Sequence, residues 1–215
     1  MKDIVIIGAG GLGREVAWII ERINLQKQQW NILGFIDDDI TVQNKRIYHY
    51  SVIGTLEWLI DLKKEIYVVC AIGHSSIRKS IIAKIDTNNN IHFPTVIDPS
   101  VIYSDSVKIG KGCIIGAGTI MTIDINIGNY VIINSDSTIG HDDVINDYVI
   151  IYPGVNVSGC VNLGECCEIG TGAQIIQGKT VGAGTVVGAG TVVVKDLPAR
   201  CTAVGVPAKV IKVFE

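Results

Sequence analysis

The most constraining feature of this sequence is an apolar side chain at every sixth position over some 100 residues. A helix repeats near 3.6 residues and a strand near 2, so neither explains the period alone. Hexapeptide repeats are typical of a parallel β-helix, in which short strands turn their large apolar residues inward. The row comprises Ile97, Tyr103, Ile109, Ile115, Met121, Ile127, Ile133, Ile139, Ile145, Ile151, Val157, Leu163, Ile169, Ile175, Val181, Val187 and Val193.

A second row, four positions after the first, holds mostly small or β-branched residues. It includes Cys113 and Cys167, which we interpret as core fillers rather than metal ligands or disulfides. Three hexapeptides make one coil, so residues 18 apart should stack. The glycines that often follow the first row, such as Gly110 and Gly140, tolerate positive φ, and we predict that they form the corners.

Residues 1–95 have a different pattern, in which short apolar segments alternate with helical ones. A strand at 4–7 precedes Gly8-Ala9-Gly10-Gly11-Leu12-Gly13 and a helix, which is the order of a dinucleotide-binding motif. Further strands at 32–36 and 67–72 end at Asp37-Asp38 and Gly73. Because these loops follow parallel strands, we expect them to meet at one edge of a small α/β sheet and bind phosphate and ribose.

Two helices are expected between and after these strands. Thr55 is predicted to cap a short helix, and residues 76–85 carry an apolar stripe that begins at Ile77. A complete dinucleotide-binding fold needs two such α/β halves, and about 95 residues supply one. The pattern therefore argues against an NAD-dependent dehydrogenase.

Composition and charge exclude several classes of protein. The net charge of −3 argues against nucleic-acid binding. No apolar stretch of 18 residues occurs, and the first residues lack the pattern of a signal peptide, so we expect a cytoplasmic protein without membrane insertion.

His141 is the only histidine in the repeat, and it lies two residues after the inward-facing position of Ile139. Its neighbour on the next coil is Gly159, which leaves room for a thioester beside the imidazole and offers a backbone N–H to an oxyanion. Imidazole, with an ordinary pKa near 6.5, accepts a proton at neutral pH. A carboxylate stabilises the imidazolium, and Asp142 is the first candidate for that role, with Asp143 second.

Charge is unevenly distributed along the repeat. Between Lys111 and Lys179 there are acids but no Lys or Arg, and such an acidic zone would attract a cationic amine. The chain beyond residue 178 is basic and suits the phosphates of a coenzyme.

The repeat, which is followed by Gly205-Val206-Pro207-Ala208-Lys209, resembles the hexapeptide-repeat acyltransferases. Together with the N-terminal half, it resembles the bacterial sugar acetyltransferases, which include nucleotide-amino-sugar N-acetyltransferases and sialic acid O-acetyltransferase relatives. The resemblance implies a Rossmann-like α/β half domain at 1–95 that binds a nucleotide sugar. It also implies a left-handed β-helix at 96–215 that binds acetyl-CoA and performs catalysis.

The resemblance also assigns roles to particular residues. His141 would be the catalytic base and Asp142 its partner, with acetyl-CoA as co-substrate and no metal. Two positions depart from the family, since Leu12 and Ile150 stand where relatives carry histidines. A homotrimer with active sites between subunits is expected, with His141 facing the neighbouring chain. The implied nucleotide-sugar contacts are Gly10, Gly11, Leu12, Asp37, Asp38 and Gly73, and the implied coenzyme contacts are Gly159, Thr171 and Ala189.

Four competing functions can be compared with this pattern. The first is acetyl-CoA-dependent N-acetylation of a nucleotide-linked amino sugar by direct attack on the thioester. The second is O-acetylation of sialic acid or another surface-polysaccharide sugar. The acidic zone argues against sialic acid, because sialic acid is an anion. A metal-dependent hydrase on the same fold needs three histidines, and the repeat holds only His141. The fourth is a non-catalytic nucleotide-binding scaffold.

Overall fold

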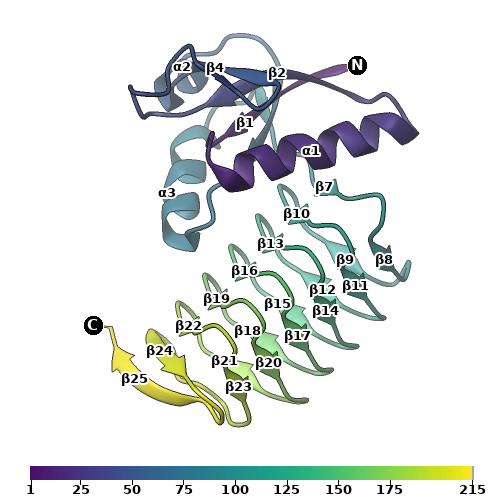
Figure 1. Ribbon diagram of the computed structural model, residues 1–215, viewed down its shortest axis with the longest axis vertical. Helices are drawn as coiled ribbons and strands as arrows, with labels where there is room; N and C mark the ends of the chain where they lie inside the picture. Colours follow the sequence, from purple (N-terminus) through teal and green to yellow (C-terminus); the bar gives the residue numbers. More distant parts are fainter. Residues whose placement is uncertain (215) are drawn as a thin grey trace. The chain divides into compact units, whose positions relative to one another are not determined.

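The computed structural model describes residues 1–214 and divides the chain into two compact units, Met1–Pro99 and Ser100–Glu215 (Figure 1). Each unit has its own apolar core. Within the described residues, none of the helices has the length and apolar character that crossing a membrane requires.

The first unit is built on a twisted sheet with strand order β3-β4-β2-β1-β5-β6. The central strand β1 pairs in parallel with β2 and β5, and its residues Ile4 to Ile6 are fully buried. Helix α1 (Gly11–Gln26) follows the glycine-rich loop, as predicted, and α2 (Leu56–Ile60) and α3 (Ser75–Ile85) follow later strands. The strands are β1 (Lys2–Ile7), β2 (Trp30–Ile36), β3 (Arg46–Ile47), β4 (Tyr50–Gly54), β5 (Ile66–Cys70), β6 (Ile91–His92) and β7 (Val96–Ile97).

The face that α3 buries differs from the predicted stripe. Ile77 is 51% exposed, whereas Arg78, Ile82 and Ile85 are buried. These three residues are spaced i, i+4 and i+7 and therefore share one side of the helix. The prediction that Ile77 is buried was wrong, because hydrophobicity alone favours burial of an isoleucine over burial of an arginine. Arg78 can be buried because its guanidinium donates hydrogen bonds to backbone carbonyls.

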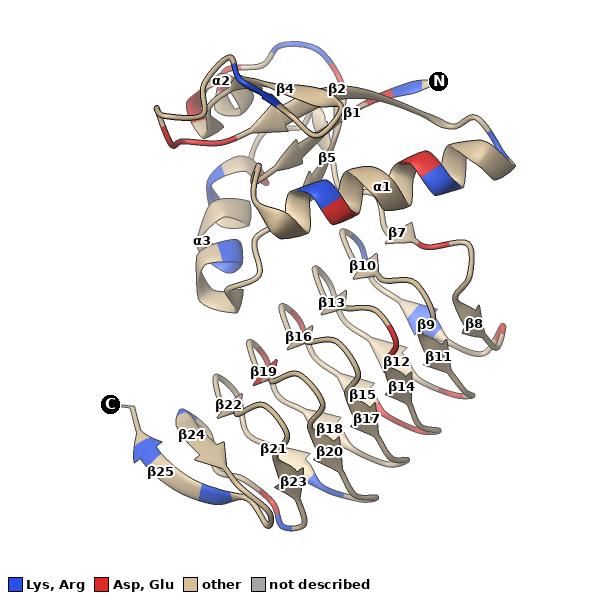
Figure 2. Ribbon diagram, viewed as in Figure 1, with Lys and Arg blue, Asp and Glu red and all other residues tan. Residues whose placement is uncertain are grey.

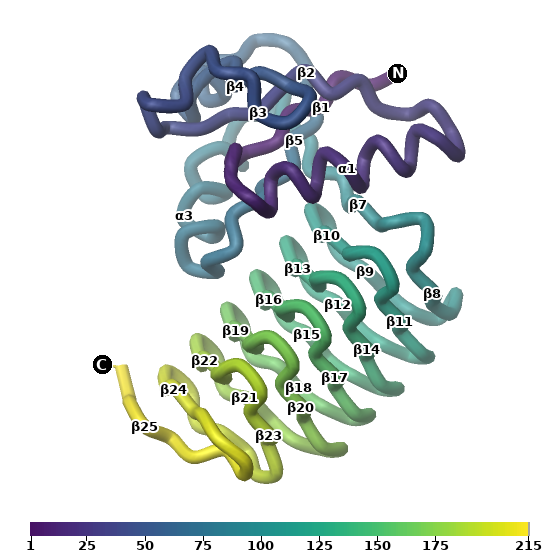
Figure 3. Tube along the Cα trace, in the orientation of Figure 1, coloured from purple at the N-terminus to yellow at the C-terminus, as the bar shows by residue number. Residues whose placement is uncertain are grey.

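The second unit is a parallel β-helix whose strands stack in register from one coil to the next. Thr138 pairs with Ile120 on one side and with Asn156 on the other, and the same register holds along three sheets (Figures 1 and 3). An antiparallel pair, β24 and β25, follows the last coil. The strands are β8 (Ile102–Tyr103), β9 (Lys108–Ile109), β10 (Ile114–Ile115), β11 (Ile120–Met121), β12 (Asn126–Ile127), β13 (Ile132–Ile133), β14 (Thr138–Ile139), β15 (Val144–Ile145), β16 (Ile150–Ile151), β17 (Asn156–Val157), β18 (Asn162–Leu163), β19 (Glu168–Ile169), β20 (Gln174–Ile175), β21 (Thr180–Val181), β22 (Val186–Val187), β23 (Val192–Val193), β24 (Cys201–Val204) and β25 (Lys209–Val213).

The sixth-residue row forms the core of this β-helix, as predicted. From Ile115 to Val193 every member is buried, and only the first coil departs, with Tyr103 46% exposed. Cys113 and Cys167 are fully buried, which confirms them as core fillers. Their thiols donate to the carbonyls of Gly128 and Gly182 at 3.1 and 3.0 Å.

The predicted corner glycines do not adopt positive φ. Left-handed residues occur two positions later instead, and they include non-glycine residues such as Asp142 (φ 62°) and Cys160 (φ 59°). A glycine such as Gly140 is needed because an added Cβ would lie 2.4 Å from the backbone nitrogen of Gly159 on the next coil. Close approach between coils, rather than backbone conformation, therefore explains that glycine row.

Candidate active site

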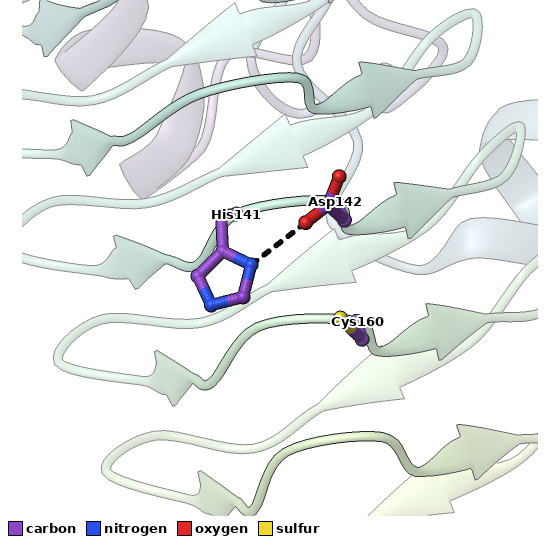
Figure 4. A group of neighbouring side chains, drawn as sticks. All are labelled: His141, Asp142 and Cys160. Carbon is purple, nitrogen blue, oxygen red and sulfur yellow. Dashed lines mark hydrogen bonds and ion pairs between the residues drawn. The ribbon is translucent and has the colours of Figure 1, made fainter.

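His141 and Asp142 lie in the corner between β14 and β15. The Nδ1 atom of His141 is 2.8 Å from Oδ2 of Asp142 (Figure 4). Both side chains remain open to solvent, with 48% of the imidazole and 58% of the Asp142 side chain exposed. The left-handed backbone at Asp142 turns its carboxylate toward the ring that precedes it.

The imidazole of His141 packs against Gly159 on the next coil. A Cβ on Gly159 would lie 2.5 Å from both Cε1 and Nε2 of the ring, so only glycine fits beneath it. The N–H of Cys160 donates to the carbonyl of His141 at 2.8 Å and fixes the spacing of the two coils. Stacking of His141 on Gly159 is thus as predicted, but the space above the glycine holds the imidazole rather than leaving room for a thioester.

Asp143, the second candidate for a carboxylate partner, has a different role from Asp142. It is buried in the β-helix, where its carboxylate accepts the N–H groups of Val161 at 2.7 Å and Gly140 at 3.1 Å. Burial raises the pKa of Asp143 to about 7, although both N–H groups act in the opposite direction. Asp143 therefore anchors the corner from inside, and Asp142 is the partner of His141.

Cys160 is the neighbour that sequence reasoning missed. It stacks one coil beyond Asp142, and one ligand atom from each of His141, Asp142 and Cys160 lies within 4.8 Å of the other two (Figure 4). All three side chains are exposed. The sequence does contain a signal for Cys160, because it follows Asp142 by 18 residues and therefore occupies the same position one coil later.

The predicted coenzyme contacts are only partly brought together. Thr171 and Ala189 are both exposed and lie on neighbouring coils at the same corner, where the N–H of Gly190 donates to the carbonyl of Thr171 at 2.8 Å. Gly159 precedes Thr171 by two hexapeptides and therefore lies at a different corner from these two residues. A single chain does not gather all three around His141.

In the first unit, the strand ends form a cavity of about 160 Å³. Asp37 holds the glycine-rich loop, because its carboxylate accepts the N–H of Ala9 at 2.9 Å and that of Asp39 at 3.0 Å. Of the six predicted nucleotide-sugar contacts, only Asp37 and Asp38 line this cavity. Its lining comprises Ile7, Gly8, Ile36, Asp37, Asp38, Leu56, Ile72 and Ile81.

The other predicted contacts surround the first turn of α1 and the end of β5. Gly10 is the N-cap residue of α1, and Gly11 and Leu12 open the helix. Asp38, rather than Thr55, caps α2, since the Asp38 carboxylate accepts the N–H of Leu56 at 2.8 Å and Thr55 makes no capping bond. A longer-range carboxylate thus takes the place expected of the local hydroxyl.

Arg78 is a second residue that the sequence did not reveal. Its side chain is buried, and Nη1 donates to the carbonyls of Ile72 at 2.7 Å and Gly73 at 2.9 Å. The guanidinium therefore fixes the loop that carries Gly73. Nothing in the local sequence distinguishes this arginine from a solvated helix residue.

The comparisons with known proteins cover the whole chain. Residues 3–85 match the family model described as the PglD N-terminal domain. A comparison with curated protein sequences gives no match. Several solved structures are similar over nearly the whole chain.

A histidine-to-asparagine variant of perosamine N-acetyltransferase from Caulobacter crescentus, in complex with CoA and GDP-perosamine, has 30% identity and a TM-score of 0.89. The alignment covers 99% of this chain and 98% of that one. The acetyltransferase domain of PglB from Neisseria gonorrhoeae FA1090, in complex with acetyl coenzyme A, has 32% identity and a TM-score of 0.89, with 98% and 99% covered. WeeI from Acinetobacter baumannii AYE has 30% identity and a TM-score of 0.87, with 98% and 100% covered.

These relatives share both the N-terminal α/β domain and the left-handed β-helix, so the predicted fold class is confirmed. The chain therefore belongs to the sugar acetyltransferase family of the hexapeptide-repeat acyltransferases.

Proposed function

We propose that the protein transfers the acetyl group of acetyl-CoA to the amino group of a nucleotide-linked amino sugar, with His141 as general base. The observation that carries this proposal is the His141–Asp142 pair at 2.8 Å, with the imidazole held against Gly159 on a sugar acetyltransferase fold. Two relatives support the substrates, since the structure of one is a complex with CoA and GDP-perosamine and that of the other a complex with acetyl coenzyme A.

The reaction needs one base and no covalent enzyme intermediate. With Nδ1–H donating to Asp142, Nε2 of His141 is left as the proton acceptor. The sugar amine attacks the thioester carbon and gives a proton to Nε2; the C–S bond then breaks, and the CoA thiolate leaves and takes up a proton. A positioned base of this kind contributes about 10²- to 10⁴-fold to the rate.

Gly159 serves this mechanism first as the surface on which the ring rests. Its N–H donates to no acceptor among the described residues, which suits the predicted oxyanion contact. Thr171 and Ala189 are proposed to contact the coenzyme farther along the β-helix.

The electrostatics of the β-helix favour a cationic acceptor near His141. Acidic residues occupy the middle coils and basic residues lie toward the ends (Figure 2). An amino sugar carries positive charge in solution and is drawn to the acidic coils, whereas the anionic coenzyme suits the basic end. This distribution supports N-acetylation over transfer to an anionic sialic acid.

The first unit is proposed to hold the nucleotide part of the acceptor. Gly10 and Gly11 begin a helix whose N-terminal N–H groups attract phosphate, and Asp37 and Asp38 line the adjacent cavity. Gly73 is held nearby by Arg78, and Leu12 supplies an apolar contact.

A homotrimer with active sites between subunits is proposed from the family resemblance. Within one chain, Thr171 and Ala189 lie at a different corner from Gly159, the neighbour of His141. A neighbouring subunit in a trimer could supply them to the active site. Light scattering should give three times the mass of a single chain, which is 23.1 kDa. A mass equal to that of one chain would refute the trimer.

The proposal is tested by thiol release from acetyl-CoA with UDP- and GDP-linked amino sugars and with free sialic acid. Release with an amino sugar and a gain of one acetyl group on its nitrogen, by mass spectrometry and NMR, is the expected result. Release with sialic acid alone would replace the proposal with O-acetylation. If none of these acceptors causes thiol release, although the protein binds nucleotides, the non-catalytic scaffold would be favoured.

A further inference from the structure

His141, Asp142 and Cys160 bring three different metal-binding atoms to one exposed point of the β-helix. One ligand atom from each side chain lies within 4.8 Å of the other two, and the His141 Nδ1 and Asp142 Oδ2 atoms are already 2.8 Å apart (Figure 4). We infer that these residues form a site for a thiophilic divalent metal ion such as Zn²⁺, and that occupancy of this site switches the enzyme off. The inhibitory part of this inference rests on the function proposed for His141, whereas metal binding does not.

The backbone makes the cluster a feature of the coil stack rather than an accident of loose side chains. Asp142 and Cys160 occupy the same place in successive coils and share the left-handed conformation, with φ of 62° and 59°. The same backbone geometry directs the two side chains from the same corner. The hydrogen bond from the N–H of Cys160 to the carbonyl of His141, at 2.8 Å, joins their coils directly beside the cluster.

The donor atoms suit zinc in type and number. Zn²⁺ binds thiolate, imidazole and carboxylate with bonds of about 2.0 to 2.3 Å, and three protein ligands leave a fourth position for water. Tetrahedral geometry with such bonds places the donors about 3.3 to 3.8 Å apart. Because all three side chains are exposed, modest rotations bring the thiol close enough.

Charge also favours a cation here. A thiolate and a carboxylate neutralise Zn²⁺, and no Lys or Arg occurs between Lys111 and Lys179 to oppose it. Binding replaces the thiol proton of Cys160, which passes to solvent, by a Zn–S bond.

The metal would disable the base through the imidazole tautomer. A Zn–Nδ1 bond replaces the Nδ1–H···Asp142 hydrogen bond, and the neutral ring then carries its proton on Nε2. Nε2 can no longer accept a proton from an amine. Cys160 itself makes no hydrogen bond to the ring among the described residues and takes no part in the proton transfer proposed above, so we expect turnover without its thiol.

The test is a Co²⁺ titration of the metal-free protein, because tetrahedral cobalt reports thiolate ligation by a charge-transfer band in the near ultraviolet. The wild type should show that band with one equivalent of Co²⁺, and competition with Zn²⁺ should remove it. Cys160→Ser should abolish the band and weaken Zn²⁺ binding at least tenfold. Cys166→Ser, a change of a neighbouring cysteine outside the cluster, should leave both unchanged.

Activity separates the two proposals. Zn²⁺ at ten times its Kd should lower wild-type turnover about tenfold, and Cys160→Ser should turn over at the wild-type rate but require at least tenfold more Zn²⁺ for the same inhibition. Absence of a thiolate band in the wild type, or its survival in Cys160→Ser, would overturn the metal site while leaving the proposed function intact. A thiolate band in a protein that acetylates no amino sugar would contradict the proposed function and leave the site standing.

Discussion

Replacing Gly159 with alanine should impair the base without unfolding the β-helix. The new Cβ would lie 2.5 Å from Cε1 and Nε2 of His141, and ordinary carbon contacts begin near 3.4 Å. The imidazole must therefore move by about 1 Å, and a displacement of this size costs about 100-fold in rate, or about 2.7 kcal/mol of transition-state stabilisation. The ring is half exposed and can swing toward solvent, so we expect little loss of stability.

The coil position itself tolerates alanine. Ala183 and Ala189 occupy equivalent positions of later hexapeptides, and the backbone at Gly159 is not left-handed. A fall in activity of Gly159→Ala with an unchanged melting temperature would consequently reflect the ring rather than the fold.

A double-mutant cycle isolates that cause. We would measure kcat at saturating acetyl-CoA and acceptor for the wild type, Gly159→Ala, His141→Ala and the double variant. If alanine acts only by displacing the ring, the double variant should be no slower than His141→Ala. Wild-type turnover of Gly159→Ala, or fully additive losses in the double variant, would refute the reasoning.

Three further changes probe the supports of the site. Asp142→Asn keeps an oxygen for the 2.8 Å contact but removes the charge, so steady-state kinetics should show a kcat about tenfold lower and unchanged KM values for both substrates. An unchanged kcat would contradict the role of Asp142. Asp143 has a pKa of 3.8 unfolded and about 7 folded, so its contribution to stability is present below pH 4 and lost as pH rises through 7. Between pH 5 and 7 the free energy of unfolding in urea should fall by about 2 kcal/mol more in the wild type than in Asp143→Asn, and equal slopes would refute the buried carboxyl. Arg78→Lys loses the paired contact with the carbonyls of Ile72 and Gly73. The KM for the nucleotide sugar should therefore rise about tenfold while the KM for acetyl-CoA stays constant. A parallel rise in both KM values would contradict a specific role of Arg78 at the nucleotide-sugar site.

The fold was predictable because its determinant is periodic. A row of apolar residues at every sixth position repeats the same burial requirement in each coil, and the stacking of three hexapeptides per coil then places Gly159 beside His141 without coordinates. The pairing of His141 with Asp142 followed from chain adjacency. Strand, glycine loop and helix likewise identified the first unit.

Contacts that depend on three-dimensional proximity were beyond the sequence. The burial of Arg78 needs the carbonyls at the end of β5, and capping of α2 by Asp38 joins residues that are distant along the chain. The left-handed corners were misplaced because the glycines that directly follow the sixth-residue row, such as Gly140, serve close packing between coils. The left-handed positions lie two residues later and are taken by Asp142, Cys160 and other glycines such as Gly172. Cys160 was overlooked because cysteines were weighed by spacing along the chain rather than across coils.

The central claim, that His141 is the base of a direct acetyl transfer, is tested most directly by one comparison. Turnover of the wild type and of His141→Asn would be measured with acetyl-CoA and the best nucleotide-linked amino sugar, with calorimetric Kd values for both ligands. We expect kcat to fall about 10²- to 10⁴-fold while both Kd values stay within about threefold. A variant that turns over at nearly the wild-type rate would contradict the account.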